Sequence, residues 1–278
     1  MANNLSKDAK IQVISALCED CSIRGIERMT GIHRDTIMRL GVRMGEGCAE
    51  IHDAKMQNLP CADLQVDEIW GFIGKKNKHA TPDERNTGLG DAWTFVALDR
   101  GTKLVPSFVA GKREAYYANM FLEDLAGRSS LRPQLSSDAL SAYDEAVERE
   151  FGAEVDCGQV VKTFTVVNLN QDAASRYSPA ECCAATRTAK VGNPVQCRIC
   201  TSHVEKQNHT MRTHIRRLTR LTNAFSKQLE NFKAAIALHF ARYNVCKIHL
   251  AIRTTPAQAA GVEQSIWTVG NLIEACGE

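Results

Sequence analysis

The chain has 278 residues, of which 44% are apolar and 24% are charged. Against roughly 150 residues per domain, this length predicts two domains, or one domain with appendages. The composition excludes disordered, collagen-like and coiled-coil proteins. No apolar run approaches the roughly 18 residues of a membrane span, and the polar N-terminus is unlike a signal peptide. The 11 cysteines are odd in number and irregularly spaced, which indicates the reduced thiols of a cytoplasmic protein.

The net charge of +2 is unevenly distributed along the chain. Residues 1–60 carry 8 basic and 8 acidic side chains, residues 61–200 carry 16 and 19, and residues 201–278 carry 10 and 5. The net charges of these parts are therefore 0, −3 and +5. A basic C-terminal part indicates a polyanionic partner, and a solvated basic face is the alternative.

The N-terminal part predicts three short helices. Ser6 and Ser22 are candidate N-caps, Gly31 separates the second helix from the third, and Gly41 or Gly45 is expected to end the third. This order is typical of a helix-turn-helix, whose last helix presents polar side chains to the major groove of DNA. Small helical bundles without a DNA partner share the pattern. The candidate DNA contacts are Arg34, Thr36, Arg39 and Arg43.

Beyond Pro60 the hydrophobic pattern changes to the alternation of β-strands. Strands are expected over 64–72, 92–98 and 103–109, then a helix over 114–125, a strand over 132–138 and a helix over 143–151. A polar, glycine-rich stretch over 75–91 is expected to be a mobile hairpin loop. The order predicts a mixed sheet covered by helices, in an α/β or α+β chain. Residues 152–200 have no clear period and are expected to form an insertion or a long loop.

A helical pattern resumes at His203 and is rich in basic residues. Apolar or small side chains recur at steps of three, four or seven and predict an inward stripe, formed by Val204, Met211, Ile215, Leu218, Thr222 and Phe225. Between Lys206 and Lys227 there is no acidic residue. The candidate DNA contacts of this part are Lys206, Arg216, Arg217 and Arg220. Arg212 shares one predicted helical face with Arg216 and Arg220, at i, i+4 and i+8. A further helix is expected over 232–240, and Trp267 is expected to anchor the C-terminal part by packing.

Three carboxylates stand out by their positions. Asp67 lies inside an apolar strand, Asp138 ends another strand, and Glu205 begins the basic helix. If the strands are neighbours, the three side chains can converge at one edge of the sheet. Clustered carboxylates repel one another unless a divalent cation neutralises them, and two Mg²⁺ or Mn²⁺ ions held there could support phosphodiester cleavage. The alternative is three unrelated surface or ion-paired acids.

Several motifs together identify a resemblance. The segments LQVDEIWGF, LSSDALSAYDEAV and TSHVEKQNHTMRTHIRRLTRLTNAFSKQLEN resemble transposases of the insertion-sequence-one family, which belong to the DDE class. The segments SIRGIERMTGIHRDTI and HFARYNVCKIH are similar to the helix-turn-helix and the C-terminal end of that family. The resemblance implies an RNase-H-like catalytic domain whose triad is Asp67, Asp138 and Glu205. It also implies a basic catalytic residue seven positions after the glutamate, which is Arg212.

The resemblance also implies a function and a domain order. Residues 1–58 would form a helix-turn-helix domain that binds terminal inverted repeats in double-stranded DNA. Residues 59–278 would form the catalytic domain, with an insertion around 152–200 and a C-terminal helical extension. The chain would cleave the element ends, join the 3′-OH ends to target DNA with two metal ions, and act as at least a dimer in the bacterial nucleoid. A silent DNA-binding regulator and a metal-dependent nuclease without strand transfer are the alternatives.

Two features depart from the family pattern. Asp138 and Glu205 are 67 positions apart, so residues 152–200 are expected to loop out before the last helix. Ala139 follows the second aspartate where family members often have glycine, and this could alter the turn there.

Other residues leave alternatives open. Cys197 and Cys200, followed by His203, His209 and His214, could bind zinc, but their spacing differs from that of zinc fingers, and loop thiols with surface imidazoles are the alternative. His203 could also assist the site from close by or only order the start of its helix.

Glu68 and His249 have two interpretations each. Glu68 follows Asp67 directly and is expected to point to the opposite strand face, where structural pairing is favoured over metal binding. His249 could contact DNA or pack beside Tyr243.

Overall fold

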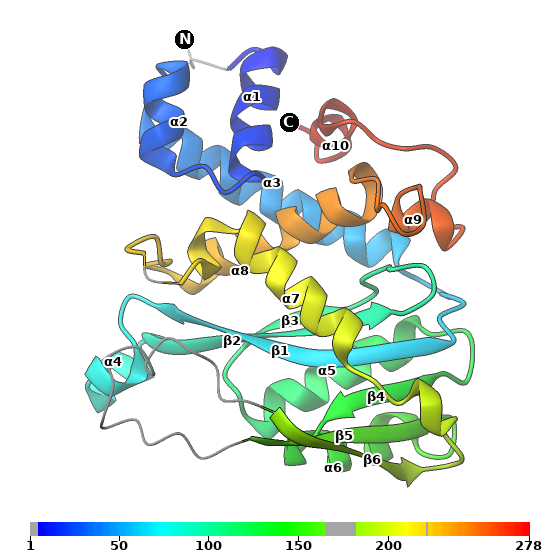
Figure 1. Ribbon diagram of the computed structural model, residues 1–278. Helices are drawn as coiled ribbons and strands as arrows, with labels where there is room; N and C mark the ends of the chain where they lie inside the picture. Colours follow the sequence, from blue (N-terminus) through cyan, green and yellow to red (C-terminus); the bar gives the residue numbers. More distant parts are fainter. Residues whose placement is uncertain (1–4, 165–181, 221) are drawn as a thin grey trace.

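A mixed β-sheet forms the centre of the computed structural model, which describes residues 5–164, 182–220 and 222–278. Its six strands are β1 (Asp63–Ile73), β2 (Gly90–Asp99), β3 (Phe108–Gly111), β4 (Gln134–Asp138), β5 (Asp156–Phe164) and β6 (Cys182–Val191). They lie in the order β3-β2-β1-β4-β5-β6 (Figure 1). The fold is therefore a mixed α/β arrangement, as the hydrophobic pattern predicts.

Helices precede, interrupt and follow the sheet. The helices are α1 (Lys7–Leu17), α2 (Ile23–Thr30), α3 (Arg34–Lys55), α4 (Pro82–Asn86), α5 (Ala115–Arg128), α6 (Ser141–Phe151), α7 (Ser202–His214), α8 (Leu229–Ala241), α9 (Pro256–Ala259) and α10 (Val269–Ala275). Short 3-10 or π turns are η1 (Asn77–His79), η3 (Gln196–Arg198), η4 (Arg216–Leu218) and η5 (Arg242–Cys246). Across the described ranges, every helix is too short or too polar to cross a membrane.

Strand direction changes at β1. Strands β1, β2 and β3 pair antiparallel, β4 and β5 run parallel to β1, and β6 returns antiparallel to β5. The parallel pairing of β1 with β4 covers only Asp63–Gln65 and Gln134–Ser136. Beyond these residues β1 and β4 no longer pair, and this opening positions the candidate site.

Each face of the sheet is covered by helices. The Phe95 ring of β2 lies 5.8 Å from the ring of Phe121 in α5 and 6.3 Å from that of Tyr143 in α6. The next residue, Val96, belongs to the other buried cluster, which contains Phe232 of α8. This alternation follows from the period of two in a strand. Helices α5 and α6 thus cover one face, and α7 and α8 cover the other (Figure 1).

The first two N-terminal helices begin where the sequence predicts. The side chains of Ser6 and Ser22 accept hydrogen bonds from the backbone N–H groups of Ala9 and Gly25, at 3.3 and 3.0 Å. Gly31 ends α2 in the left-handed conformation, with φ of 71°. These contacts satisfy backbone donors that have no partner inside the helix. That the three helices form a DNA-binding helix-turn-helix stays a prediction.

The third helix is longer than predicted, because neither Gly41 nor Gly45 ends it and it continues to Lys55. Gly45 instead lies against α8, where an added Cβ would be 2.3 Å from the carbonyl oxygen of Ala234. Glycine is required here for the close approach of two helices and does not act as a stop signal. Helix α3 ends just before the expected domain boundary after residue 58 and packs on α8 of the following part.

Replacing Gly45 with Ala should lower the free energy of unfolding by about 1–3 kcal/mol, because the methyl group must displace the α8 backbone. Urea unfolding measures the effect. Gly127 is the matched control, since it is exposed in α5 and a Cβ there would meet no other described atom within 4 Å. Gly127→Ala should keep stability or raise it by up to about 1 kcal/mol through helix propensity. Equal losses in both variants would contradict the close packing of α3 and α8.

The expectation of a long loop over 152–200 is wrong for the described residues that form strands, whereas the expectation of an insertion stays a prediction. Residues 156–164 and 182–191 form the antiparallel pair β5 and β6 and extend the sheet by two strands. Strand β6 is exposed along almost its whole length, so it lacks the hydrophobic alternation by which strands are recognised. The remainder of the expected long loop, 165–181, lies outside the described residues.

Other elements differ in extent from the sequence-based expectation. The strand expected over 103–109 is short, since only 108–111 pair as β3, although Leu104 and Val105 are fully buried. The loop expected over 75–91 contains η1 and α4. The strand ending at Asp138 and the helix ending at Phe151 are confirmed.

The predicted basic helix is interrupted. Helix α7 ends at His214, and Ile215 is extended, with φ of −106° and ψ of 102°. Ile215 and Leu218 are still buried, but Arg212, Arg216 and Arg220 do not share one helical face as predicted. Contacts across the molecule hold the interrupted form, because Arg216 pairs with Asp20 and Arg217 donates to Ser226.

The C-terminal part packs through Trp267, as predicted. Its indole Nε1 donates to Glu263 Oε2 at 3.2 Å, and the Lys55 ammonium lies 5.0 Å from its ring centre. Trp267 therefore connects the segment between α9 and α10 to the end of α3.

Candidate active site

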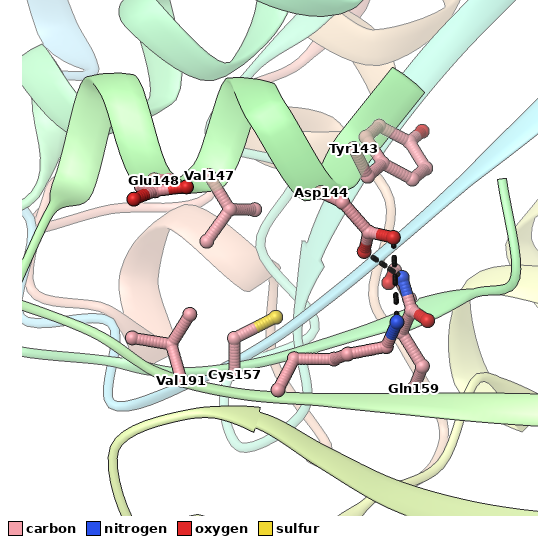
Figure 2. A pocket seen from close by; sticks show the side chains of 9 residues that line it. Tyr143, Asp144, Val147, Glu148, Cys157, Gln159 and Val191 are labelled. Atoms are coloured by element: carbon pink, nitrogen blue, oxygen red, sulfur yellow. Dashed lines mark hydrogen bonds and ion pairs between the residues drawn. The ribbon is translucent and has the colours of Figure 1, made fainter. Parts of the chain in front are cut away.

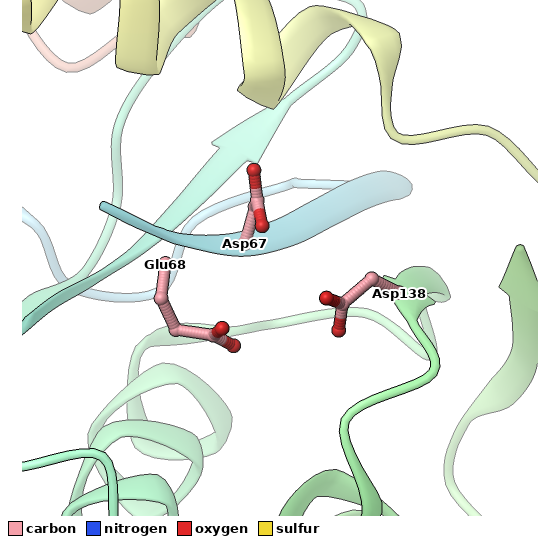
Figure 3. Close-up of side chains that lie close together, drawn as sticks. All are labelled: Asp67, Glu68 and Asp138. Carbon is pink, nitrogen blue, oxygen red and sulfur yellow. The ribbon is translucent and has the colours of Figure 1, made fainter. Parts of the chain in front are cut away.

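Asp67 and Asp138 meet where β1 and β4 stop pairing. The register aligns Gln65 with Ser136, so Asp67 and Asp138 lie level with each other two residues further on. Together with Glu68, they offer carboxylate oxygens that lie within 4.8 Å of one another (Figure 3). Within the described ranges, this is the one group of three or more His, Cys, Asp or Glu side chains close enough to share an ion. We call Asp67, Glu68 and Asp138 the acidic cluster.

Glu68 is in this cluster although it leaves β1 on the face opposite to Asp67 (Figure 3). The expectation that Glu68 points to the opposite strand face is therefore confirmed, although its carboxylate still lies close to the other two. Because β4 does not pair with β1 here, no backbone separates the two faces, and the longer Glu68 side chain reaches the opening. Its predicted structural pairing is confirmed, since Glu68 accepts from the Arg113 guanidinium at 3.0 Å, and Arg113 also lies 3.9 Å from Asp138.

Glu205 lies near the acidic cluster without belonging to it. It lines a cavity of about 380 Å³ whose other walls are Asp67, Glu68, Ile69, Asn208, His209, Arg212 and Arg220. The Glu205 carboxylate pairs with the ammonium of Lys162 in β5 and accepts from the hydroxyl of Thr201. The structure therefore brings two of the three predicted carboxylates together and places the third in the adjoining cavity.

Two contacts fix α7 on β1. The buried Gln65 accepts hydrogen bonds from the backbone N–H groups of His203 and Val204, at 3.0 and 3.2 Å, in the first turn of α7. One turn later, Asn208 Nδ2 donates to Asp67 Oδ2 at 2.9 Å. Gln65 and Asp67 lie on the same strand face, so β1 itself sets how α7 presents Glu205 and Arg212 to the cavity.

The carboxylates of the site carry opposite pKa shifts. Burial raises the pKa of Asp67 to about 7, and the charges of Glu68, Asp138 and Glu205 add to the shift. Burial also raises the pKa of Glu205, but the hydrogen bonds from Lys162 and Thr201 outweigh it and leave that pKa below its ordinary value. The negative charge of Asp67 is therefore destabilised by burial and by neighbouring carboxylates. The negative charge of Glu205 is stabilised by Lys162 and Thr201.

The basic wall of the cavity is also desolvated. Burial, followed by the charge of Arg220, lowers the pKa of Arg212 to about 10. The Arg212 guanidinium donates to the carbonyl oxygen of Leu218 at 3.2 Å. Two guanidinium groups thus line a cavity with carboxylates, an arrangement that can bind a phosphate beside a metal ion.

The donor set fits a hard divalent cation. The Glu68 carboxylate is buried, which raises its pKa, and the hydrogen bonds from the Tyr143 hydroxyl and the Arg113 guanidinium only partly offset this. All donors of the acidic cluster are carboxylate oxygens, which Mg²⁺ and Mn²⁺ prefer. A divalent cation would compensate the repulsion and desolvation that raise the pKa of Asp67.

The predicted DNA contacts are unequally available. Arg34, Arg39 and Lys206 are exposed, and Thr36 is half-buried. Arg43 pairs with the Glu278 carboxylate, and Arg216 pairs with Asp20 at 3.0 Å. Arg217 is directed to Ser226, whereas Arg220 is exposed and lines the cavity beside Arg212.

The remaining histidines and cysteines form no ligand group within the described residues. Cys200 Sγ lies 3.0 Å from Ser202 Oγ, and His203 Nδ1 lies 3.4 Å from Lys103 Nζ. His203, at the start of α7, therefore contacts the basic side chain of Lys103. His249 packs edge-on against Tyr243 with ring centres 6.5 Å apart, which confirms the packing alternative.

A second cavity, of about 240 Å³, lies between α6 and strands β4, β5 and β6 (Figure 2). Its walls are Ser137, Tyr143, Asp144, Val147, Glu148, Cys157, Gln159, Lys190 and Val191. Asp144 accepts from Gln159 at 2.6 Å and from Lys190 at 3.3 Å, so this carboxylate and this ammonium compensate each other.

Several side chains of the site have no clear signal in the sequence. Lys162 lies in a stretch without a hydrophobic period, and Arg113 precedes α5 at a position that nothing connects to Glu68 before the fold is known. Asn208 is different, because it lies one helical turn after Glu205 and Val204. A polar residue at that spacing on the inward side of a helix indicates a contact with the sheet below.

Comparisons with known proteins add little to this geometry. The chain matches no protein-family model and no curated protein. Among solved structures it is similar to that of a piggyBac transposase synaptic complex with hairpin DNA, determined by cryo-EM. The TM-score is 0.45 at 11% sequence identity, over 97% of this chain and 69% of that chain. Similarity at this level establishes neither a shared fold nor a shared activity.

Proposed function

We propose that the chain is a DDE transposase of the insertion-sequence-one type. It would bind the terminal inverted repeats of its element, cleave the phosphodiester at the element ends and join the 3′-OH ends to target DNA. One observation carries the proposal: Asp67 and Asp138 lie level on neighbouring parallel strands, under a helix that brings Glu205 and Arg212 into the adjoining cavity.

The sheet supports an RNase-H-like assignment for residues 59–278. Three antiparallel strands are followed by two strands parallel to β1, which are reached through α5 and α6. Asp67 and Asp138 are on β1 and β4, the two central strands of this order, which run parallel. The motif segments around Asp67, Asp138 and Glu205, which resemble the transposase family, lie together around this part of the sheet.

Each residue of the site would have a defined role. Asp67, Asp138 and Glu205 would hold two Mg²⁺ or Mn²⁺ ions, which activate the attacking oxygen and stabilise the leaving oxygen when bound. Arg212 and Arg220 would bind phosphate oxygens of the DNA in the same cavity. Arg113, placed between Glu68 and Asp138, would hold the Asp138 carboxylate in position. Lys162 compensates the charge of Glu205 through Oε1, and the other carboxylate oxygen, Oε2, would act as the metal ligand.

Recognition of the element ends would belong to residues 1–58. The exposed side chains of Arg34 and Arg39 on α3 are the best placed of the predicted contacts for base edges or phosphates. Arg43 could join them only by leaving Glu278. Because two ends must be held together during transposition, the active form would be at least a dimer.

A plasmid that carries the coding sequence with its flanking DNA supplies candidate element ends for the test. With Mg²⁺, the purified chain should cut at the element ends and produce junctions with target DNA that sequencing can map. With EDTA, both products should be absent. Cutting without junctions would identify a nuclease, and binding without cutting would identify a regulator; either result would overturn the proposal.

A further inference from the structure

Beside the acidic cluster, aromatic side chains gather on one face of β1 and β2. Trp70 and Trp93 are directly opposite each other in the antiparallel pairing. The ring centres of Trp70 and Phe72 are 5.6 Å apart, and those of Phe72 and Phe225 are 4.9 Å apart. We call Trp70, Phe72, Trp93 and Phe225 the aromatic surface.

Trp70, Phe72 and Phe225 are not part of the core formed by the described residues, whereas Trp93 packs against the edge of one buried cluster. Gly71, between Trp70 and Phe72, faces the helices: a Cβ there would lie 3.0 Å from Leu218 and 3.1 Å from Phe232. Trp70 and Phe72 therefore point to the other face of β1, where they are half-buried and belong to neither of the two buried clusters. Large rings left half in solvent at this position can take a further flat partner.

Each tryptophan of the surface has a cation over its ring. Lys76 Nζ lies 5.4 Å from the centre of Trp70 and 5.8 Å from that of Phe72. The Arg113 guanidinium lies 4.9 Å from the centre of Trp93. Rings interleaved with cations fit a ligand that is both flat and negatively charged.

The aromatic surface is continuous with the acidic cluster. Arg113 contacts Trp93 on one side and Glu68 on the other, with a distance of 3.0 Å to the Glu68 carboxylate. Along β1, Trp70 is two residues beyond Glu68 and points to the same face, which separates them by about 6.6 Å. A base attached next to a phosphate at the acidic cluster would reach Trp70 over this distance.

We propose that the aromatic surface stacks unpaired bases of the DNA strand whose phosphodiester lies at the acidic cluster. Bases inside a duplex have both faces covered by their neighbours, so only an unpaired base can offer its face to Trp70 or Trp93. Lys76 and Arg113 stabilise the phosphates that accompany such a base. The inference rests on the proposed function, because it takes the strand held at the acidic cluster to be DNA.

The test uses the full-length chain in EDTA, so that binding is measured without cleavage. The probes are a 30-base-pair duplex with a five-nucleotide unpaired 3′ flank and the same duplex fully paired. The chain has three tryptophans, and Trp267→Phe removes the one that lies outside the aromatic surface. In this background the flanked duplex should quench tryptophan fluorescence, because stacked bases contact Trp70 and Trp93. The fully paired duplex should quench it much less.

Trp70→Ala should weaken binding of the flanked duplex by about 5- to 150-fold, the range for one base–aromatic stack, and leave the paired duplex unchanged. Trp70→Phe should recover most of the affinity, because a benzene ring still stacks. Circular dichroism of each variant checks that the fold is kept. Equal weakening for both duplexes, or no preference for the flank in the parent, would overturn the inference.

The inference and the proposed function can fail separately. If the chain binds the unpaired flank through Trp70 but cuts no DNA in Mg²⁺, the stacking inference is supported and the proposed transposase function is contradicted. If the chain cuts and joins DNA but Trp70→Ala keeps the full preference for the flank, only the stacking inference is contradicted.

Discussion

Asp67→Asn and Asp138→Asn should each reduce Mg²⁺-dependent DNA cleavage by more than roughly 100-fold, to the background level. Even residues that only support a metal ligand typically cost 10- to 100-fold, and ligands of one site act as a unit. Each change keeps the shape of the side chain and removes a charge that would hold the ions. Asp83→Asn is the matched control, since Asp83 is exposed on α4 and should not affect cleavage. The double variant should be no less active than either single one.

The third metal-binding carboxylate is either Glu205 or Glu68, and substituting each residue distinguishes these two assignments. Glu205→Gln should be as inactive as Asp67→Asn, whereas Glu68→Gln should lose less, because Glu68 pairs with Arg113. DNA binding in EDTA should survive in all four variants, since the exposed basic residues are unchanged. Cleavage that survives Glu205→Gln but not Glu68→Gln would show that the acidic cluster alone binds the metal.

Asp67→Asn should also make the metal-free protein more stable at neutral pH. Because burial raises the pKa of Asp67 from 3.8 to about 7 in the folded state, the folded protein binds more protons than the unfolded protein between these values. The free energy that Asp67 contributes is thus present below pH 4 and is lost as the pH rises to 7. The loss is up to about 4 kcal/mol, at 1.36 kcal/mol per pKa unit.

Urea unfolding of both proteins in EDTA, from pH 4.5 to 8, measures this effect as a difference. Other groups titrate in both proteins, among them His52 and His239, whose pKa values burial lowers to about 4 and about 3. Their contributions cancel in the difference. The advantage of the variant should grow as the pH rises and level off above pH 7. A difference that does not change with pH would mean that Asp67 is ionised as easily in the folded protein as in the unfolded chain.

Strands with buried side chains could be predicted, and strands without them could not. Strands β1 and β2 place alternate residues in two buried clusters, so both strands are rich in apolar residues. Strand β6 is an exposed edge strand, and its sequence has no hydrophobic pattern that would predict a strand. The end of α3 was predicted wrongly for a similar reason, because Gly45 allows α8 to approach, and this contact exists only in the folded chain.

Some residues of the candidate site could likewise be identified from the sequence, and others could not. Asp67 could be identified because a charge inside an apolar strand is costly unless a partner or a metal ion compensates it, and Asp138 could be identified because it ends a neighbouring strand. The approach of Glu68 could not, since it depends on where the pairing of β1 with β4 ends. The ion pair of Glu205 with Lys162 depends on β5, which the sequence did not indicate.

The binding of Mn²⁺ to the metal-free protein tests the central claim most directly, that these carboxylates form a divalent metal site. Electron paramagnetic resonance counts the bound ions, and the same titration is repeated with Asp67→Asn, Asp138→Asn and Asp83→Asn. The wild-type chain and Asp83→Asn should bind Mn²⁺ with equal affinity, and the other two variants should bind it at least roughly tenfold more weakly. Equal Mn²⁺ binding in all four proteins would contradict the assignment of Asp67 and Asp138 as metal ligands.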